Sequence, residues 1–283
     1  AELSTLMPDK SLAQVKTEFG PELLSLSKQY AAESSTVVKA AYQAVSAGIT
    51  PSKDAVSEFL KTAGAAAVGG VSDIETAVDG ISSVINAYGK DVLSATAASD
   101  LMFTAVRMGK TTFPELANSL YNVTPTASAL GVSFQNVTAA VASLTAQGTP
   151  TSVATTQLNQ LFAELGKGST EVAKTFKKLT HQSFKDFIGS GKSLQDALQV
   201  LERHTKKNKL QMVDLFGSIE AGKSAMSLTG KGTETFSTNL AAMKASAGET
   251  QKAFQKVASD ESFKFEQAKA AFEATTITLG TKL

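Results

Sequence analysis

Residues 112–165 read TFPELANSLYNVTPTASALGVSFQNVTAAVASLTAQGTPTSVATTQLNQLFAEL, and this stretch decides the fold class. Thr112 and Glu115 form a capping box, in which each side chain satisfies the other's exposed backbone amide at a helix start. Later helices are predicted to start at a Ser or Thr and to end at a glycine. The predicted starts are Thr124, Ser133 and Thr149, and the predicted ends are Gly131, Gly148 and Gly166. The stretch therefore predicts helices of ordinary length joined by tight turns.

The same alternation of helix start and helix end signals continues toward the N-terminus. Pro21 is predicted to open a helical run that Gly48 closes. Thr50 and Pro51 predict the next start, and Ser72 with Glu75 predicts a second capping box. We expect an N-terminal helical segment at 1–48 and a helical core domain at 49–232.

The C-terminal part, 233–283, has a strong helical tendency with a break near Gly248. Phe254, Phe265 and Thr276 are spaced at 11 residues, a period typical of a nearly straight helix. This spacing spans barely two periods, so a single packed helix is the preferred interpretation. We expect a long C-terminal helix here that could form a coiled coil. The whole pattern predicts an all-α, multi-helix fold, for which compact and elongated arrangements both remain open.

Composition excludes several kinds of chemistry. The chain has 283 residues, no Cys, two His, and a net charge of +1 from 27 basic and 26 acidic side chains. Without Cys there is no disulfide framework, thiolate zinc site or cysteine nucleophile. Two His cannot build a multi-histidine metal site. The balanced charge argues against broad nucleic-acid binding.

One motif fits a phosphate-binding loop. Gly217–Ser224, GSIEAGKS, matches G-x-x-x-x-G-K-[ST], in which Lys223 would meet a triphosphate and Ser224 would bind magnesium. Such a loop needs a buried strand before it, and LQMVDLF does not have that pattern. A nucleotide hydrolase is therefore the weaker alternative. Gly189–Ser193 fits less well still, because Asp186 stands where the first glycine belongs.

Other chemically interesting residues have simpler interpretations. A basic run that could contact phosphates is interpreted as a solvated helix end; it consists of Arg203, His204, Lys206, Lys207 and Lys209. His181 is expected on the surface. The carboxylate pairs Glu261 with Glu266 and Asp73 with Glu75 are expected on polar faces. We predict no catalytic residue, no cofactor and no metal ligand, and hence no enzyme.

Membrane and targeting signals are weak in this sequence. The first ten residues have no apolar stretch of signal-peptide length, and Asp9 stands where such a peptide would be apolar. Ala63–Val71 is too short to span a bilayer and is flanked by Lys61 and Asp73. A helical membrane-active module stays open as an alternative function.

A family resemblance carries the functional prediction. Leu101–Leu161, LMFTAVRMGKTTFPELANSLYNVTPTASALGVSFQNVTAAVASLTAQGTPTSVATTQLNQL, resembles the core of bacteriophage tail tape measure proteins. The resemblance extends through SFKDFIGSGKSLQDALQVL and MVDLFGSIEAGKSAMSLTG, and covers at least residues 50–255. Its most specific part is FPELA with the helix-turn-helix series after it.

The resemblance implies a structural protein of the virion that occupies the lumen of the tail tube. Such a protein templates tail length during assembly in the host cytoplasm. It is released at infection and assists DNA delivery across the host envelope. The implied partners are tail-tube subunits, tail-tip or baseplate proteins, tail assembly chaperones and further copies of the chain, without specific nucleic-acid binding. Members are usually much longer, so this chain is expected to be a segment of one.

Overall fold

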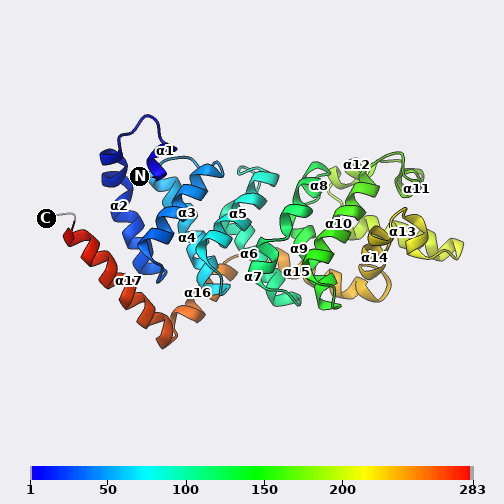
Figure 1. Cartoon of the computed structure of the whole chain (residues 1–283). Coiled ribbons are helices and arrows are strands. Elements are labelled where there is room, and N and C mark those ends of the chain that lie inside the picture. The colour runs from blue at the N-terminus through cyan, green and yellow to red at the C-terminus, as the bar shows by residue number, and fades with distance from the viewer. Residues whose placement is uncertain (1, 281–283) are drawn as a thin grey trace. The chain divides into compact units, whose positions relative to one another are not determined.

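The computed structural model describes residues 2–280, and over that range the chain has 17 α-helices, three 3-10 helices and no strand (Figure 1). The all-α prediction is confirmed. The residues form two compact units. The first unit contains the residues up to Ile85, Ser94–Ser99 and the residues from Gly248 onward; the second contains Asn86–Leu93 and Asp100–Ala247.

The first unit joins helices from both ends of the chain. Its helices are α1 (Glu2–Thr5), α2 (Leu12–Gln29), α3 (Ser34–Ser46), α4 (Lys53–Gly69), most of α5 (Ile74–Tyr88), the start of α6 (Ala95–Met108), α16 (Glu249–Ala258) and α17 (Glu261–Gly280). Helix α16 packs along α4, and α17 packs on α2, so segments far apart in sequence lie side by side (Figure 1).

Small residues on α4 set the distance between these helices. A Cβ at Gly69 would lie 2.8 Å from the backbone nitrogen of Phe254 on α16. The ring of Tyr30 lies directly over Gly64 and meets the Phe254 ring edge-on, with 5.4 Å between ring centroids. The Tyr30 hydroxyl donates to the carbonyl of Lys61 at 2.9 Å. A side chain at either glycine would overlap its neighbour, so this packing requires a residue without a Cβ at both positions.

The N-terminal prediction needs a correction, because Pro21 lies inside α2 and does not begin it. The helix starts ten residues earlier than Pro21 at the cap Ser11, whose hydroxyl accepts from the amide of Gln14 at 3.3 Å. The single run to Gly48 is also wrong. It breaks after Tyr30, where Ala31 adopts a left-handed conformation (φ 54°) and α3 begins anew. Burial of Tyr30 against α4 stabilises this turn, which has no glycine or proline to mark it in the sequence.

Another correction concerns the start of α5. Asp73 is its cap, with the Thr76 amide donating to Asp73 Oδ1 at 2.7 Å. The Ser72 hydroxyl instead donates to the carbonyl of Asp73, so the expected capping box of Ser72 with Glu75 does not form. Both Ser and Asp are good caps, and here the amide and the hydroxyl of Thr76 both donate to the Asp73 carboxylate.

The long C-terminal helix is confirmed as α17, with two shorter helices before it in the segment from residue 233. The break near Gly248 occurs as expected, with Gly248 at φ 83°. A second break at Ser259 and Asp260 was not expected. It places Phe254 on α16 and Phe265 on α17, so the 11-residue spacing does not run along one helix and the single-helix interpretation was wrong.

The second unit surrounds one almost fully buried helix. Its remaining elements are α7 (Phe113–Ala117), η1 (Leu120–Asn122), α8 (Thr124–Ala129), α9 (Phe134–Ala146), α10 (Thr151–Gly166), α11 (Glu171–Thr180), α12 (Phe184–Gly189), α13 (Leu194–Asn208), η2 (Met212–Leu215), α14 (Ile219–Ser227), η3 (Gly230–Gly232) and α15 (Thr233–Lys244). Every residue of α9 from Val137 to Thr145 is buried. Helix α15 packs on α9, and α14 packs on α10.

Side-chain caps form at several of the predicted helix starts, whereas α8 and α10, predicted from Thr124 and Thr149, begin without one. Thr112 and Glu115 form the expected capping box, Ser133 caps α9, and Ser193 caps α13. The buried Asn239 of α15 donates to Ser143 of α9 at 2.9 Å. A Cβ at Gly109 would lie 3.0 Å from the Cα of Ala142. Close contacts through small residues therefore recur in this unit.

We predict opposite effects for two glycine-to-alanine substitutions in the first unit. Gly69→Ala should destabilise the unit by about 1–3 kcal/mol, because the new methyl overlaps the backbone of α16. Gly20→Ala, in the interior of α2 with open space around it, should stabilise it by about 0.5–1 kcal/mol. Chemical denaturation of the two variants measures both. Equal changes in stability would contradict the close-packing interpretation.

A second prediction concerns alkaline pH. Burial raises the pKa of Tyr30 to about 12, whereas an unfolded chain loses this proton near ~10. The contribution of neutral Tyr30 is thus fully present below about pH 10 and is lost as pH rises toward 12. Tyr30→Phe should flatten the fall of unfolding free energy in that window. Tyr121→Phe, at a residue 59% exposed, is the matched control and should leave the slope unchanged.

Candidate functional site

The Gly217–Ser224 motif forms a capped turn leading into α14. Residues Met212–Leu215 before it are a 3-10 helix, and no strand lies within residues 2–280. Ser218 caps α14 by accepting from the Ala221 amide at 3.2 Å. The parallel sheet that a phosphate-binding loop requires is absent from the described chain.

A carboxylate occupies the position that a phosphate would need. The backbone amides of Gly217 and Ser218 donate to the two carboxylate oxygens of Glu164 on α10, at 2.7 and 2.8 Å. These are the donors that would face an anion at the start of the helix. Glu164 therefore fills the anion position from within the chain and ties α14 to α10.

Gly222 and Ser224 of the motif are buried in the packing of α14. A Cβ at Gly222 would lie 3.0 Å from the Cβ of Val213, so this glycine lets α14 approach η2. Ser224 is fully buried and has no hydrogen-bond partner for its hydroxyl within the described chain, while Lys223 is exposed. Lys223 and Ser224 thus occupy different environments, and the geometry does not favour a joint role on one triphosphate.

The related stretch Gly189–Ser193 is also a helix connection. Gly191 has φ 89°, which only glycine adopts freely, and Ser193 caps α13. The Ser193 amide donates to Asp196 Oδ2 at 2.7 Å, completing the capping box. Its polar groups are used in connecting α12 to α13.

The basic run lies along the C-terminal end of α13. Lys206 pairs with Glu202 at 2.7 Å, and His204 Nδ1 lies 3.2 Å from Asn208 Nδ2. Lys209 ends the helix in a left-handed conformation (φ 55°). Cations at this end also meet the negative end of the helix dipole. The position agrees with a solvated helix end.

The remaining sequence candidates have local structural roles or lie exposed on a helix. His181 is an exposed residue that ends α11 at φ 60°. Asp73 caps α5, and Glu75 accepts a long hydrogen bond of 3.5 Å from Gln43. Glu261 and Glu266 are exposed on α17, where Glu266 pairs with Lys269 at 2.9 Å.

The carboxylates whose pKa is shifted take part in helix capping and ion pairing. The pKa of Asp196 is lowered, first by the Ser193 amide, and that of Asp260 first by the Ser262 hydroxyl. The pKa of Glu22 is lowered first by the Ser57 hydroxyl and further by Lys61. Burial alone would raise the pKa of Asp73, and the hydrogen bonds from Thr76 outweigh it. A general acid at neutral pH needs the opposite shift.

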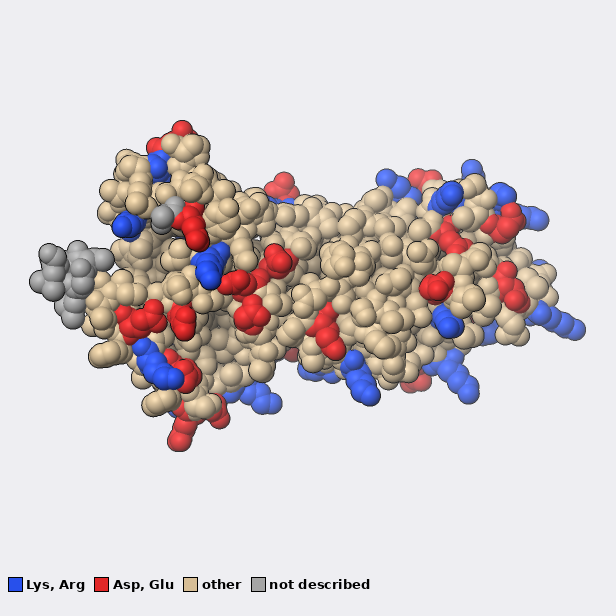
Figure 2. Space-filling view, viewed as in Figure 1, with Lys and Arg blue, Asp and Glu red and all other residues tan. Residues whose placement is uncertain are grey.

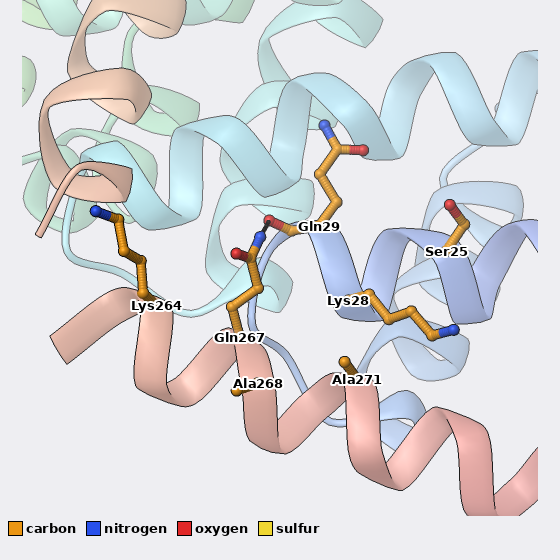
Figure 3. Close-up of a pocket in the computed structure, with 7 residues that line it drawn as sticks. All are labelled: Ser25, Lys28, Gln29, Lys264, Gln267, Ala268 and Ala271. Carbon is orange, nitrogen blue, oxygen red and sulfur yellow. Dashed lines mark hydrogen bonds between the residues drawn. The ribbon is translucent and has the colours of Figure 1, made fainter. Parts of the chain in front are cut away.

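A shallow groove of about 490 Å³ lies between α2 and α17 (Figure 3). Its walls carry Lys28 and Lys264, and Gln267 crosses it to donate to the carbonyl of Gln29 at 3.3 Å. The two alanines beside it, Ala268 and Ala271, supply little apolar area. The groove therefore marks a loosely packed helix contact within the first unit.

Residues 2–280 contain neither a metal-binding cluster nor a helix suited to crossing a bilayer. Among residues 2–280, no set of three His, Asp or Glu side chains is grouped so that it could hold a metal ion. No helix in that range combines the length and apolar character needed to cross a bilayer. Ala63–Val71 belongs mostly to α4 and turns Gly64 and Gly69 toward neighbouring elements.

Sequence reasoning missed Glu164 because this residue lies 53 and 54 positions from the two amides whose hydrogen bonds it accepts. A lone Glu near a helix end carries no local signal of such a contact. It also missed Tyr30, whose role depends on the glycine at position 64. Both residues work through tertiary contacts, which no spacing pattern encodes.

We predict that Glu164→Gln lowers the unfolding free energy by about 1–3 kcal/mol, because two backbone amides lose a charged acceptor. Glu171→Gln, at a glutamate with an exposed ion pair to Lys174, should change it by less than about 0.5 kcal/mol.

Isothermal titration of Mg-ATP into wild type and Lys223→Ala should show no binding to either. Magnesium-dependent binding that Lys223→Ala abolishes would contradict the packing role of this motif.

Comparisons with known proteins identify the family of this chain. The model of the family described as phage-related minor tail protein matches residues 21–217. Across the whole chain, the sequence is 37% identical over 296 aligned positions to a probable tape measure protein of Clostridium phage phiCD119. The chain spans 31% of the length of that relative. No solved structure matches. The chain therefore belongs to the tape measure-like family of phage-related minor tail proteins.

Proposed function

We propose that this chain is a section of a tail tape measure that occupies the lumen of the tail tube, templates tail length during assembly and leaves at infection to assist DNA delivery. The observation that carries the proposal is the alignment of the entire chain with a probable tape measure protein. The proposed role is structural and needs no catalysis. During assembly the chain would be in the host cytoplasm.

Helix packing through small residues supports this role. Interfaces such as α4 with α16 bury backbone and small side chains, so the helices lie close together. Stability scales with buried apolar area, and alanine-rich interfaces bury little per residue. Interfaces of this kind suit a narrow space and separate at modest cost when the chain must pass through one.

The proposed partners are tail-tube subunits, tail-tip or baseplate proteins, assembly chaperones and the host envelope. We also propose self-association through α17. Phe265 and Phe272 are exposed on this helix and lie one heptad apart, which is the spacing of a coiled-coil seam. As a functional division we propose an N-terminal segment 1–48, a tape measure core 49–232 and a C-terminal segment 233–283.

We predict that deleting Glu261–Gly280 in phage that carry this chain shortens the tail by up to about 30 Å, the length of a 20-residue helix laid along the tube. Replacing the same residues by an equally long helix of shuffled sequence should restore the original length. Electron microscopy of purified tails measures both. Full-length tails in the deletion phage would contradict a templating role for this segment.

A further inference from the structure

A second groove, of about 400 Å³, lies in the second unit between α13, η2, α14 and η3. Its walls are tied together by hydrogen bonds. Glu202 of α13 accepts from the amide of Gly230 at 3.1 Å, and Gln147 donates to the carbonyl of Ser227 at 2.9 Å. The groove is therefore a preformed feature of this unit.

Three flexible aliphatic side chains lie among the mostly polar residues that line the groove. Leu210 is 42% exposed and Met226 is 50% exposed, and Met212 lies beneath them. The outer face of α14 continues this apolar surface with Ile219, which is 71% exposed and seven residues from Met226. Methionine side chains adapt to the shape of a partner, which makes such surfaces suited to binding protein segments.

The surroundings of the groove are positively charged. Residues 201–232 contain six Lys or Arg and three Asp or Glu, in a chain of net charge +1. Figure 2 shows Lys and Arg side chains projecting at the end of the second unit that carries α13. Two of the three carboxylates are engaged within the unit: Glu202 binds Lys206 and Gly230, and Asp214 accepts from the Gln211 amide at 2.8 Å.

Several cations near the groove have no carboxylate partner in the described chain. Lys231 lines the groove and is exposed, and Lys207 and Lys223 are exposed on the neighbouring α13 and α14. Within residues 2–280, none of the three lies within ion-pair distance of an Asp or Glu. Their charge is available to an external group.

We propose that this groove binds an acidic amphipathic helix of a partner protein, with aliphatic residues seated on Leu210 and Met226 and carboxylates facing Lys207 and Lys231. A nucleic acid would use the cations but leave the aliphatic lining without a contact. A membrane surface would meet Ile219 but not the recessed Met212. An acidic helix with one apolar face uses both the charge and the concave lining. The proposal does not depend on the tail role.

The test is fluorescence anisotropy with a labelled peptide of about 15 residues, with leucines at i, i+3, i+4 and i+7 and glutamates on its other face. It should bind the whole chain with a dissociation constant on the order of 10 µM. A peptide with lysines replacing the glutamates should bind at least about tenfold more weakly. So should a peptide with serines replacing the leucines.

Variants locate the binding to the groove. Lys207→Glu/Lys231→Glu should weaken binding about tenfold, since each exposed charge pair contributes a few-fold. Met226→Ser should weaken it similarly. Lys110→Glu/Lys178→Glu, the same charge change at exposed lysines outside the groove, should bind like wild type. Circular dichroism of each variant checks that the helices are retained.

Three results would overturn the proposal. Equal binding of the acidic peptide with and without leucines would show charge attraction alone. Binding that is insensitive to Met226→Ser would place the contact elsewhere. Absence of peptide binding would also reject it; sedimentation of the chain and flotation with anionic phosphatidylserine vesicles would then show whether a second copy or a lipid surface takes the groove. Family membership would be unaffected by any of these results.

Discussion

The structure depends on the close approach of helix backbones through glycine and alanine. Gly69 brings α4 within contact of the backbone of α16, Gly64 accommodates the ring of Tyr30, and Gly109 allows contact with Ala142 on α9. Each of these contacts leaves no room for a Cβ. These close contacts add to the burial of large side chains such as Phe113 and Phe162 and to a few buried hydrogen bonds, such as that from Asn239 to Ser143.

This packing explains why a motif that matches a phosphate-binding loop has a structural role in this chain. GSIEAGKS combines a cap, a glycine that touches Val213 and a buried serine, which are the residues a tightly packed helix start requires. The Glu164 carboxylate accepts hydrogen bonds from the two backbone amides at this helix start. In a chain rich in Gly, Ser and Thr, the residues that cap and end helices can also match the phosphate-loop pattern by chance. The secondary structure around such a match then shows whether it is a phosphate-binding loop.

Sequence alone predicts the local features well. Helix starts at Thr112 and Ser133 follow from capping chemistry, which needs only neighbours three residues away. The break after Tyr30 and the contact of Glu164 with Gly217 depend on residues more than 30 positions distant. Periodicity carries no information on such pairs. The groove near Met226 was likewise not predicted, because four separate elements form it.

The central claim is that this chain belongs inside a phage tail. The most direct measurement is mass spectrometry of purified tails after external protease treatment, before and after the tails are opened. The account predicts that peptides from the chain are recovered from intact tails in protected form and become susceptible once the tube is opened. Absence of these peptides from purified tails, or their digestion in intact tails, would contradict the proposed location.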